Sequence, residues 1–207
     1  MTIIKSISYS SDEIISNIIK LHCKGNISLD PTYSRGNFYK KDVPEPIIKM
    51  DIYPQAEGVI QADVESLPLR DGSMETIMFD PPFLATSGRT DAEDENNIIV
   101  KRFGLYPNEK ELHSFYSRAL QELYRVLQNE GILICRSQDK VSGGKQYFSH
   151  VFIINEAVRI GFYVKDLFVL LAKNRIVADW QRNQKHARKF HSYYLVLKKS
   201  KRKVEYI

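Results

Sequence analysis

The chain has 207 residues, of which 43% are hydrophobic and 27% charged, and its formal net charge is +5. This length and composition predict one globular domain with a single core and leave little room for a second domain. No apolar run approaches the ~20 residues that span a bilayer, and the first residues lack the apolar stretch of a secretory signal. We therefore expect a cytoplasmic protein with no membrane contact.

Metal and disulfide sites find little support in the sequence. Cys23 and Cys135 have neither paired nor metal-ligand spacing, so an intracellular, reducing compartment is the default. His186 and His191 have no nearby group of acids or thiols that would complete a metal site. The sequence predicts no metal ligands.

One helix and four short strands are expected in the first 80 residues. Ser11-Asp12-Glu13 precedes an apolar repeat of helical period, which predicts an N-terminal helix within residues 1–25 that Gly25 ends. Strands follow at 26–30, 46–51, 58–63 and 75–80, and all four end in aspartate. The carboxyl ends of parallel strands line the ligand crevice of an open sheet, so these acids indicate a site for a polar small molecule. Each acid taken alone is more often a helix cap or a turn residue.

The second half of the chain alternates helices and strands. The spacing predicts helices over 108–131 and 147–161, ended by Gly131 and Gly161, and strands over 132–137, 162–173 and 191–199. The stretch SGGKQ at 142–146 lacks the spacing of a phosphate-binding loop and is expected to be a flexible turn. The order predicts an α/β fold: a mostly parallel sheet with helices on both faces and an antiparallel last strand.

The stretch TIMFDPPF at 76–83 ends an apolar strand abruptly. Neither Pro81 nor Pro82 can donate to a β-ladder, and each fixes its own φ angle. The residues allow two interpretations, a rigid turn at a strand end or a functional corner at the carboxyl edge of a sheet.

The DPPF sequence and its place after the fourth strand resemble the class I S-adenosylmethionine-dependent amino-methyltransferases. Their catalytic tetrapeptide reads Asp, Asn or Ser, then Pro-Pro, then Tyr or Phe. The resemblance covers nearly the whole chain, is nearest to phage- and prophage-type adenine-N6 DNA methylases, and implies the Rossmann-like methyltransferase fold in one domain over 1–207. It assigns catalysis to Asp80, Pro81, Pro82 and Phe83.

The same resemblance implies S-adenosyl-L-methionine as the cofactor and places its site. LDPTYSRGNF at 29–38 is similar to the family's Asp-Pro-Phe-x-Gly-x-Gly loop, with Thr32 in place of phenylalanine and Ser34 in place of the first glycine, which leaves fewer positions free to take a positive φ angle. An acid at the end of the second strand is implied to hold the ribose hydroxyls, and an acid with an apolar neighbour is implied to lie beside the adenine ring. The implied cofactor-binding residues are Asp30, Pro31, Thr32, Tyr33, Gly36, Asp51, Asp63 and Val64.

DPPF suits methylation of an aromatic amine, whose lone pair is delocalised into the ring. The Asp80 carboxylate and the Pro81 carbonyl can accept from the two N–H groups of such an amine, and the prolines fix this geometry before the substrate arrives. Phe83 can stack on the base, which contributes roughly 1–3 kcal/mol in comparable contacts. A base inside a duplex cannot reach the corner, so base flipping or a single-stranded substrate is implied.

Positive charge is concentrated in the last third of the chain, in a basic insertion at 173–190 and a basic tail at 198–203. A polyanion such as DNA suits this distribution, although basic segments also serve solubility. The resemblance supports substrate contact by Lys173, Asn174, Arg175, Lys185, His186 and Arg188. The loop at 84–106 is either a lid over substrate or a surface loop.

Three functions stay open at this stage. The first is a DNA methyltransferase, adenine-N6 by its motif, and the second is an RNA base amino-methyltransferase acting on guanine N2 or adenine N6. The third is a catalytically silent subunit that binds nucleic acid. No segment is long enough for a separate target-recognition domain, so either the long loops recognise a short site, or specificity is low, or a partner supplies it. A homodimer is the alternative to a specificity partner.

Overall fold

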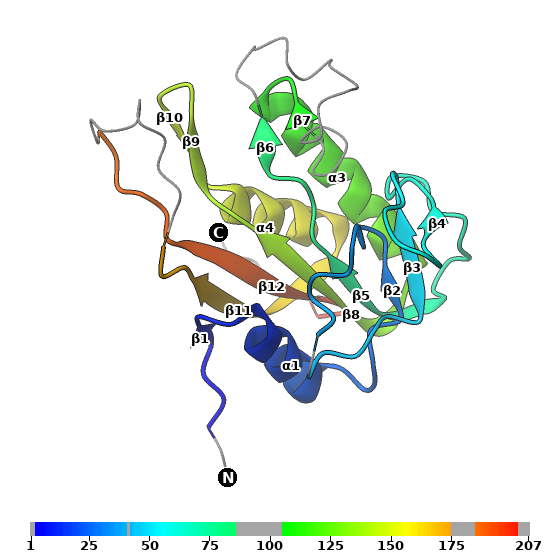
Figure 1. Ribbon diagram of the computed structural model, residues 1–207. Helices are drawn as coiled ribbons and strands as arrows, with labels where there is room; N and C mark the ends of the chain where they lie inside the picture. The colour runs from blue at the N-terminus through cyan, green and yellow to red at the C-terminus, as the bar shows by residue number, and fades with distance from the viewer. Residues whose placement is uncertain (1–2, 41, 86–104, 175–184, 203–207) are drawn as a thin grey trace.

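An eight-stranded sheet forms the centre of the molecule, in the order β1-β11-β12-β8-β5-β2-β3-β4 (Figure 1). The computed structural model describes residues 3–40, 42–85, 105–174 and 185–202. β12 is antiparallel to both of its neighbours, and the other neighbouring pairs in the sheet are parallel. The predicted α/β fold with an antiparallel last strand is confirmed. The strands are β1 Ile7–Ser8, β2 Leu29–Asp30, β3 Ile48–Asp51, β4 Ile60–Gln61, β5 Met74–Phe79, β8 Leu127–Ser137, β11 Phe162–Leu171 and β12 His191–Lys199.

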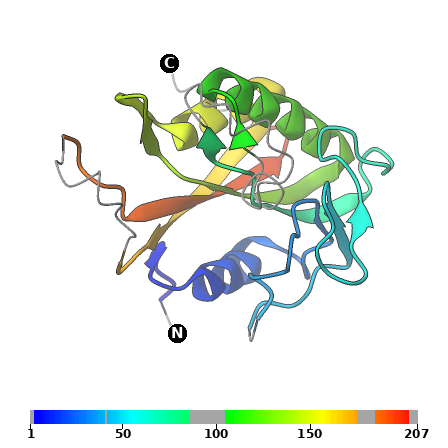
Figure 2. The same cartoon turned by 45° about the horizontal axis from the view of Figure 1, so that its top comes forward.

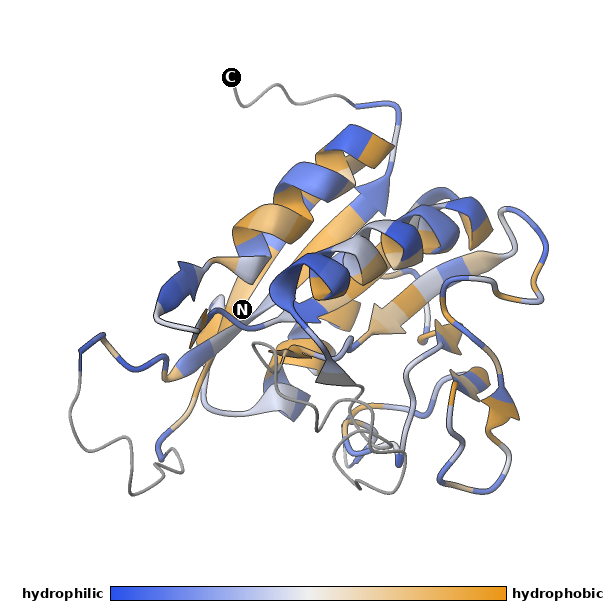
Figure 3. Cartoon of the chain, turned by 90° about the horizontal axis from the view of Figure 1, so that it is seen from above, coloured by the Kyte–Doolittle hydropathy of each residue, from blue (hydrophilic) through white to orange (hydrophobic). Residues whose placement is uncertain are grey.

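Helices cover both faces of this sheet (Figure 2). α1 (Ser11–His22) packs on one face, where Ile14, Ile15 and Ile18 join a buried cluster that includes Met78 of β5. α3 (Glu109–Val126) and α4 (Ser149–Ile160) pack on the other face, in a cluster that includes Ile77 and Phe79. Successive side chains of β5 therefore pack into the cores on opposite faces of the sheet, because side chains of a strand alternate between its two faces. Hydrophobic and hydrophilic residues alternate around the helices, as helices with one buried side require (Figure 3).

Two helix ends lie elsewhere than the sequence predicted. α1 is capped by Ser10, whose side chain accepts from the backbone N–H of Glu13, and it ends at His22 instead of at Gly25. α3 ends at Val126 and β8 begins at the next residue, so the prediction of a helix to Gly131 was wrong. A Cβ atom at Gly131 would lie 2.9 Å from the backbone oxygens of Glu75 and Gln128, so the glycine permits a close approach of strands.

The connections of the sheet also differ from the expected pattern. The described residues between β2 and β5 contain no helix, and none was predicted there, so this half of the sheet lacks the strand–helix alternation of the second half. β4 ends at Gln61, and Asp63 follows it in an isolated bridge to Ser66. The periodicity also missed short strands: β1, the β6–β7 pair at Leu84–Ala85 and Leu105–Tyr106, and the β9–β10 hairpin at Lys140–Ser142 and Lys145–Tyr147. The predicted turn at 142–146 forms the tip of that hairpin, where Gly143 and Gly144 both have positive φ angles.

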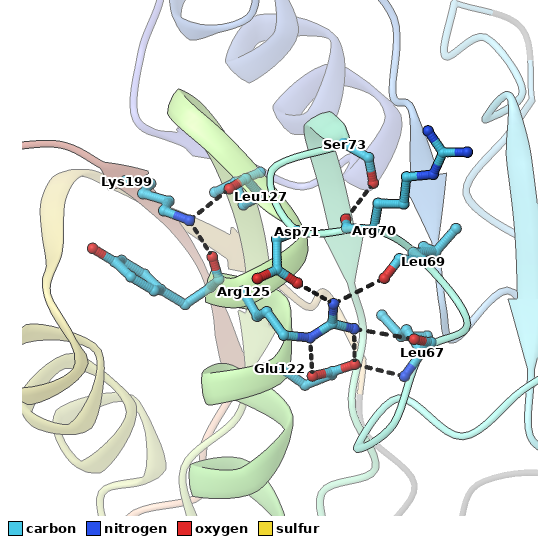
Figure 4. A network of polar contacts seen from close by, with 10 residues as sticks. Leu67, Leu69, Arg70, Asp71, Ser73, Glu122, Arg125, Leu127 and Lys199 are labelled. Carbon is cyan, nitrogen blue, oxygen red and sulfur yellow. Dashed lines mark hydrogen bonds and ion pairs between the residues drawn. The ribbon is translucent and has the colours of Figure 1, made fainter.

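Arg125, near the end of α3, anchors the loop that leads into β5 (Figure 4). Its guanidinium donates to both carboxylate oxygens of Glu122, to Asp71, and to the backbone oxygens of Leu67 and Leu69. Glu122 in turn accepts from the Leu67 N–H at 2.7 Å. One planar side chain thus donates to two carbonyls and two acids at once, which fixes the loop before β5, the strand that Asp80 follows.

Arg125→Lys should destabilise the fold by about 1–3 kcal/mol, because a lysine cannot reproduce the five donor contacts of the planar fork. Arg118→Lys is the matched control, since the Arg118–Glu65 pair is more exposed and the change should cost less than about 0.5 kcal/mol. Urea unfolding followed by circular dichroism measures both. Equal losses in the two variants would contradict an anchoring role for Arg125.

None of the helices in the described part of the chain is both long and apolar enough to cross a membrane.

Candidate functional site

The four aspartates predicted to end strands gather at one edge of the sheet. Asp30 and Asp51 are the last residues of β2 and β3, and Asp80 follows β5 directly. Asp63 lies two residues past the end of β4. Because β2, β3, β4 and β5 are parallel, these residues share the carboxyl edge, where open α/β sheets bind their ligands.

Asp30 is a buried carboxylate held by three donors. Its Oδ1 accepts from the Thr32 backbone N–H at 2.8 Å and from the Thr32 hydroxyl at 3.1 Å, and its Oδ2 accepts from the Tyr39 hydroxyl at 2.5 Å. Burial raises the pKa of Asp30 to about 7, although these hydrogen bonds favour the charged form. Asp30 therefore holds the loop after β2 through these hydrogen bonds. Its side chain is too buried to contact a ligand itself.

Thr32 joins this loop to the corner at 80–83. Its hydroxyl accepts from the Asp80 backbone N–H at 2.9 Å while it donates to Asp30. The methyltransferases that the sequence resembles have phenylalanine at this place, which cannot form either bond. Thr32 thus fixes the starting point of DPPF relative to the loop after β2, and this role was not predicted.

The loop after β2 uses two left-handed residues, although it contains one glycine. Ser34 has a φ angle of 51° and Gly36 one of 65°, so a serine adopts the conformation for which the resemblance has glycine. Tyr33 beside it is nearly buried: its ring stacks on Tyr39 at 5.5 Å, and its hydroxyl donates to Glu45 at 2.7 Å. The Tyr33 side chain therefore packs inside the protein and stabilises the loop. Any ligand contact from this residue would come through its backbone.

Asp51 connects the loops after β2 and β3. One of its oxygens accepts from the Ser34 N–H and the other from the Tyr53 N–H, both at 2.8 Å. Each carboxylate oxygen can accept more than one hydrogen bond, so Asp51 keeps acceptor capacity at the sheet edge. Burial raises its pKa. Asp63 is exposed and accepts from the Glu65 N–H at 2.9 Å, while Val64 beside it is buried.

The DPPF corner (residues 80–83) is fixed by contacts to its backbone carbonyls. The Tyr116 hydroxyl donates to the Pro82 oxygen at 2.8 Å, and the Lys140 ammonium donates to the Phe83 oxygen at 2.5 Å. Lys140 also pairs with the buried Glu109 at 3.1 Å. Within the described ranges no donor reaches the Pro81 carbonyl, the second acceptor that the amine chemistry requires.

Arg136, at the end of β8, faces the Asp80 carboxylate. Its Nη1 lies 3.4 Å from each Asp80 oxygen, and the side chains of Arg136 and Asp80 are 23% and 21% exposed. The guanidinium also lies 5.5 Å from the Phe38 ring centroid and 5.9 Å from that of Tyr194. Burial raises the pKa of Asp80 and Arg136 opposes this, so the arginine favours the ionised acceptor.

Only one of these unpredicted residues left a signal in the sequence. Arg136 follows the apolar run ILIC, so a charged residue lies next to the end of the fifth predicted strand, much as aspartates end the first four. Lys140 and Tyr116 left no such signal, because one lies in a short hairpin and the other looks like an ordinary core position of α3.

The predicted nucleic-acid contacts lie at the same edge of the sheet. Lys173 and Asn174 follow β11, and Lys185, His186 and Arg188 precede β12, which places them at the carboxyl edge. The first four of these side chains are exposed. Arg175 lies outside the described residues, as does most of the predicted substrate loop at 84–106. No group of three or more His, Cys, Asp or Glu in the described ranges is placed to hold a metal ion.

No family model and no curated protein sequence matches the chain. Solved structures match its fold. The [4+2]-cyclase SpnF is 13% identical with a TM-score of 0.54, and the match covers 90% of this chain and 80% of that one. A Bacillus halodurans protein described as a methyltransferase is 12% identical with a TM-score of 0.50, over 90% of this chain and 98% of its own.

A Thermus thermophilus protein described as a DNA modification methylase, complexed with S-adenosyl-L-methionine, is 13% identical with a TM-score of 0.48. The match covers 70% of this chain and 54% of that protein, so the chain spans about half the length of that methylase. At these identities the likeness establishes the fold, which is the Rossmann-like methyltransferase fold. A cyclase also has this fold, so the chemistry has to be argued from the site.

Gly36→Ala should destabilise the protein by more than the positive φ angle of this residue alone would cost. A Cβ atom there would lie 2.2 Å from the Tyr33 hydroxyl oxygen, so Tyr33 would have to leave its stack on Tyr39. Gly58→Ala is the matched control, because Gly58 has a φ angle of 75° and nothing within 4 Å.

Chemical unfolding should show a loss of roughly 1–2 kcal/mol for Gly58→Ala from the backbone conformation. Gly36→Ala should lose about 1–3 kcal/mol more, from the forced movement of Tyr33. Equal losses would mean that the Tyr33 ring does not depend on Gly36.

Proposed function

We propose that the chain is an S-adenosyl-L-methionine-dependent methyltransferase that methylates an exocyclic base amine in DNA, with adenine N6 as its target. The observation that carries this proposal is the position of DPPF: Asp80 follows a buried parallel strand and is tied by its own N–H to the loop after β2. The hydrogen bond from the Asp80 N–H to Thr32 therefore fixes the position of the DPPF corner relative to the candidate cofactor loop.

The residues at this edge fit the proposed cofactor. The backbone of 30–36 would follow its amino-acid portion, Asp51 would accept from the ribose hydroxyls, and Asp63 with Val64 would border the adenine ring. Asp51 retains acceptor capacity, as its role requires, and Asp63 is exposed beside Val64, whose own side chain is buried. When bound, the cofactor supplies an electrophilic methyl group on a sulfonium.

The chain's own residues then hold the amine. Asp80 would accept from one N–H and the Pro81 carbonyl from the other, which concentrates the nitrogen lone pair toward the incoming methyl group. Phe83 would stack on the base. Thr32, Tyr116 and Lys140 form hydrogen bonds with the backbone of residues 80–83. These bonds hold the DPPF corner in place, so little reorganisation is needed during methyl transfer.

DNA as the substrate is supported by charge and by the placement of that charge. Lys173, Lys185 and His186 are exposed at the same sheet edge as Asp80. Cations on this edge would bind phosphates next to a base that has been flipped into the corner. The corner would bind the amine of a base in RNA as well as in DNA. The assay of methyl transfer therefore has to distinguish the two nucleic acids.

Asp80→Ala should retain cofactor binding and lose methyl transfer by at least about 100-fold, the scale of removing one preorganised hydrogen-bonding group. The assay transfers tritium from labelled S-adenosyl-L-methionine to unmethylated genomic DNA and to total RNA, with mass spectrometry of the digested nucleosides. Calorimetry measures cofactor binding, and the exposed Asp42 provides the control variant Asp42→Ala.

N6-methyladenine in DNA with wild-type protein and none with Asp80→Ala would establish this function. Label found in RNA alone would assign the enzyme to RNA. Absence of cofactor binding in the wild-type chain would refute the methyltransferase proposal.

Arg136→Gln should move the acid limb of the kcat/KM profile to higher pH. Burial raises the pKa of Asp80 and Arg136 lowers it, so removing the arginine lets the carboxyl hold its proton at higher pH and lose its acceptor role. Arg136→Lys keeps the charge and should shift the limb less. A loss of activity with an unchanged pH profile would mean that Arg136 serves packing against Phe38 and Tyr194.

A further inference from the structure

A cluster of aromatic rings lies beyond the DPPF corner and plays no part in the chemistry described above. It joins Phe148 and His150, at the start of α4, to His191 and Tyr193, at the start of β12. The His150 ring stacks on Tyr193 with centroids 4.1 Å apart, and His191 meets Tyr193 edge-on at 5.2 Å. Phe148 stands almost perpendicular to His150, at 89° and 6.3 Å.

The orientation of His150 is fixed by a buried acid. Its Nδ1 lies 2.8 Å from Oδ1 of Asp139, and its backbone N–H donates to the same oxygen at 3.3 Å. The Asp139 side chain is 2% exposed and that of His150 is 19% exposed. The carboxylate therefore holds one edge of the imidazole and Tyr193 covers a face, so the ring is set in place before any ligand arrives.

Phe148 is the unexpected member of this cluster. It is 54% exposed and occupies the N-cap position of α4 without forming a capping bond. Ser, Thr, Asp or Asn at that position would stabilise the helix by about 1 kcal/mol. An exposed ring therefore occupies a position where a small polar residue would stabilise the helix more, so the helix itself does not account for Phe148.

The cluster is connected to the DPPF corner and to positive charge. Asp139 precedes Lys140, whose ammonium donates to the Phe83 carbonyl. The Lys189 ammonium lies 5.9 Å from the centroid of the Phe148 ring. Figure 1 shows the β9–β10 hairpin and the segment leading into β12 on the same side of the molecule. Exposed rings beside cations are the pattern that binds unpaired bases and their phosphates.

We propose that the Phe148–His150–Tyr193 cluster binds an unpaired nucleobase of a single-stranded nucleic acid, next to the base that enters the DPPF corner. The inference rests on the proposed nucleic-acid substrate and names the surface that holds the flanking strand. The base stacks on an exposed ring, and Lys189 lies where it meets the phosphate of the same nucleotide. Stacking accepts any base, so this surface provides affinity for unpaired strands without reading sequence.

The test measures binding of a fluorescent single-stranded oligonucleotide to the full chain by anisotropy. Phe148→Ala and Phe148→Leu should each weaken binding about 5- to 150-fold, the fold-change that corresponds to losing one base–aromatic stack. Phe148→Trp should retain it. Val151→Ala is the matched control, since Val151 is 44% exposed on the same helix. Its affinity for the oligonucleotide should stay within about twofold of wild type, because substitutions at exposed positions usually have small effects.

A strand with one abasic position, moved along the oligonucleotide, provides the second arm. Wild type should lose affinity at one position, and Phe148→Ala should show no further loss there. Equal binding by wild type, Phe148→Ala and Phe148→Leu would overturn the proposal, as would a wild-type chain that binds duplex but not single strands. Strand binding that depends on Phe148 in a chain that binds no S-adenosyl-L-methionine would sustain this inference and refute the proposed methyltransferase.

Discussion

The hydrogen-bonded link from Asp30 through Thr32 to the Asp80 backbone is the interaction on which the candidate site depends. A buried carboxylate is costly unless donors surround it, and Asp30 obtains them from the loop that follows its own strand and from Tyr39. Because the Thr32 hydroxyl donates to Asp30 and accepts from Asp80, satisfying one buried acid also fixes the second loop. The candidate cofactor loop and the DPPF corner are thereby built as one unit.

The same principle explains why unpredicted residues surround the corner. A rigid turn with two prolines exposes carbonyls that no β-ladder can satisfy, and Tyr116 and Lys140 satisfy two of them from the helix layer and the hairpin. Burial raises the pKa of Asp80, and Arg136 on the neighbouring strand opposes that rise. Arg136 in turn lies close to the rings of Phe38 and Tyr194, so the core on the α1 face supports the electrostatics of the corner.

The fold permits the proposed chemistry without requiring it, as the [4+2]-cyclase with the same architecture illustrates. Three features at one edge narrow the chemistry: a carboxylate faced by an arginine, an adjacent carbonyl with no described donor, and the exposed Phe148 ring with Lys189 beside it. Each of these features alone has a structural explanation. Together they are the features on which the proposed amine site and the proposed strand-binding surface depend.

The sequence by itself determined the sheet class, the antiparallel last strand and the strand-end position of Asp30, Asp51 and Asp80, because local period, turn residues and strand-ending acids are encoded in neighbouring residues. It placed the end of α3 and the role of Gly131 wrongly, since the glycine makes room for the backbone of a distant strand, β5, at Glu75. Tertiary structure alone decided that Thr32 bridges two loops, that Arg136 faces Asp80, and that Asp139 orients His150 beside Tyr193. These contacts join residues far apart in the chain, and no local pattern in a single sequence records which distant partner will satisfy a buried charge.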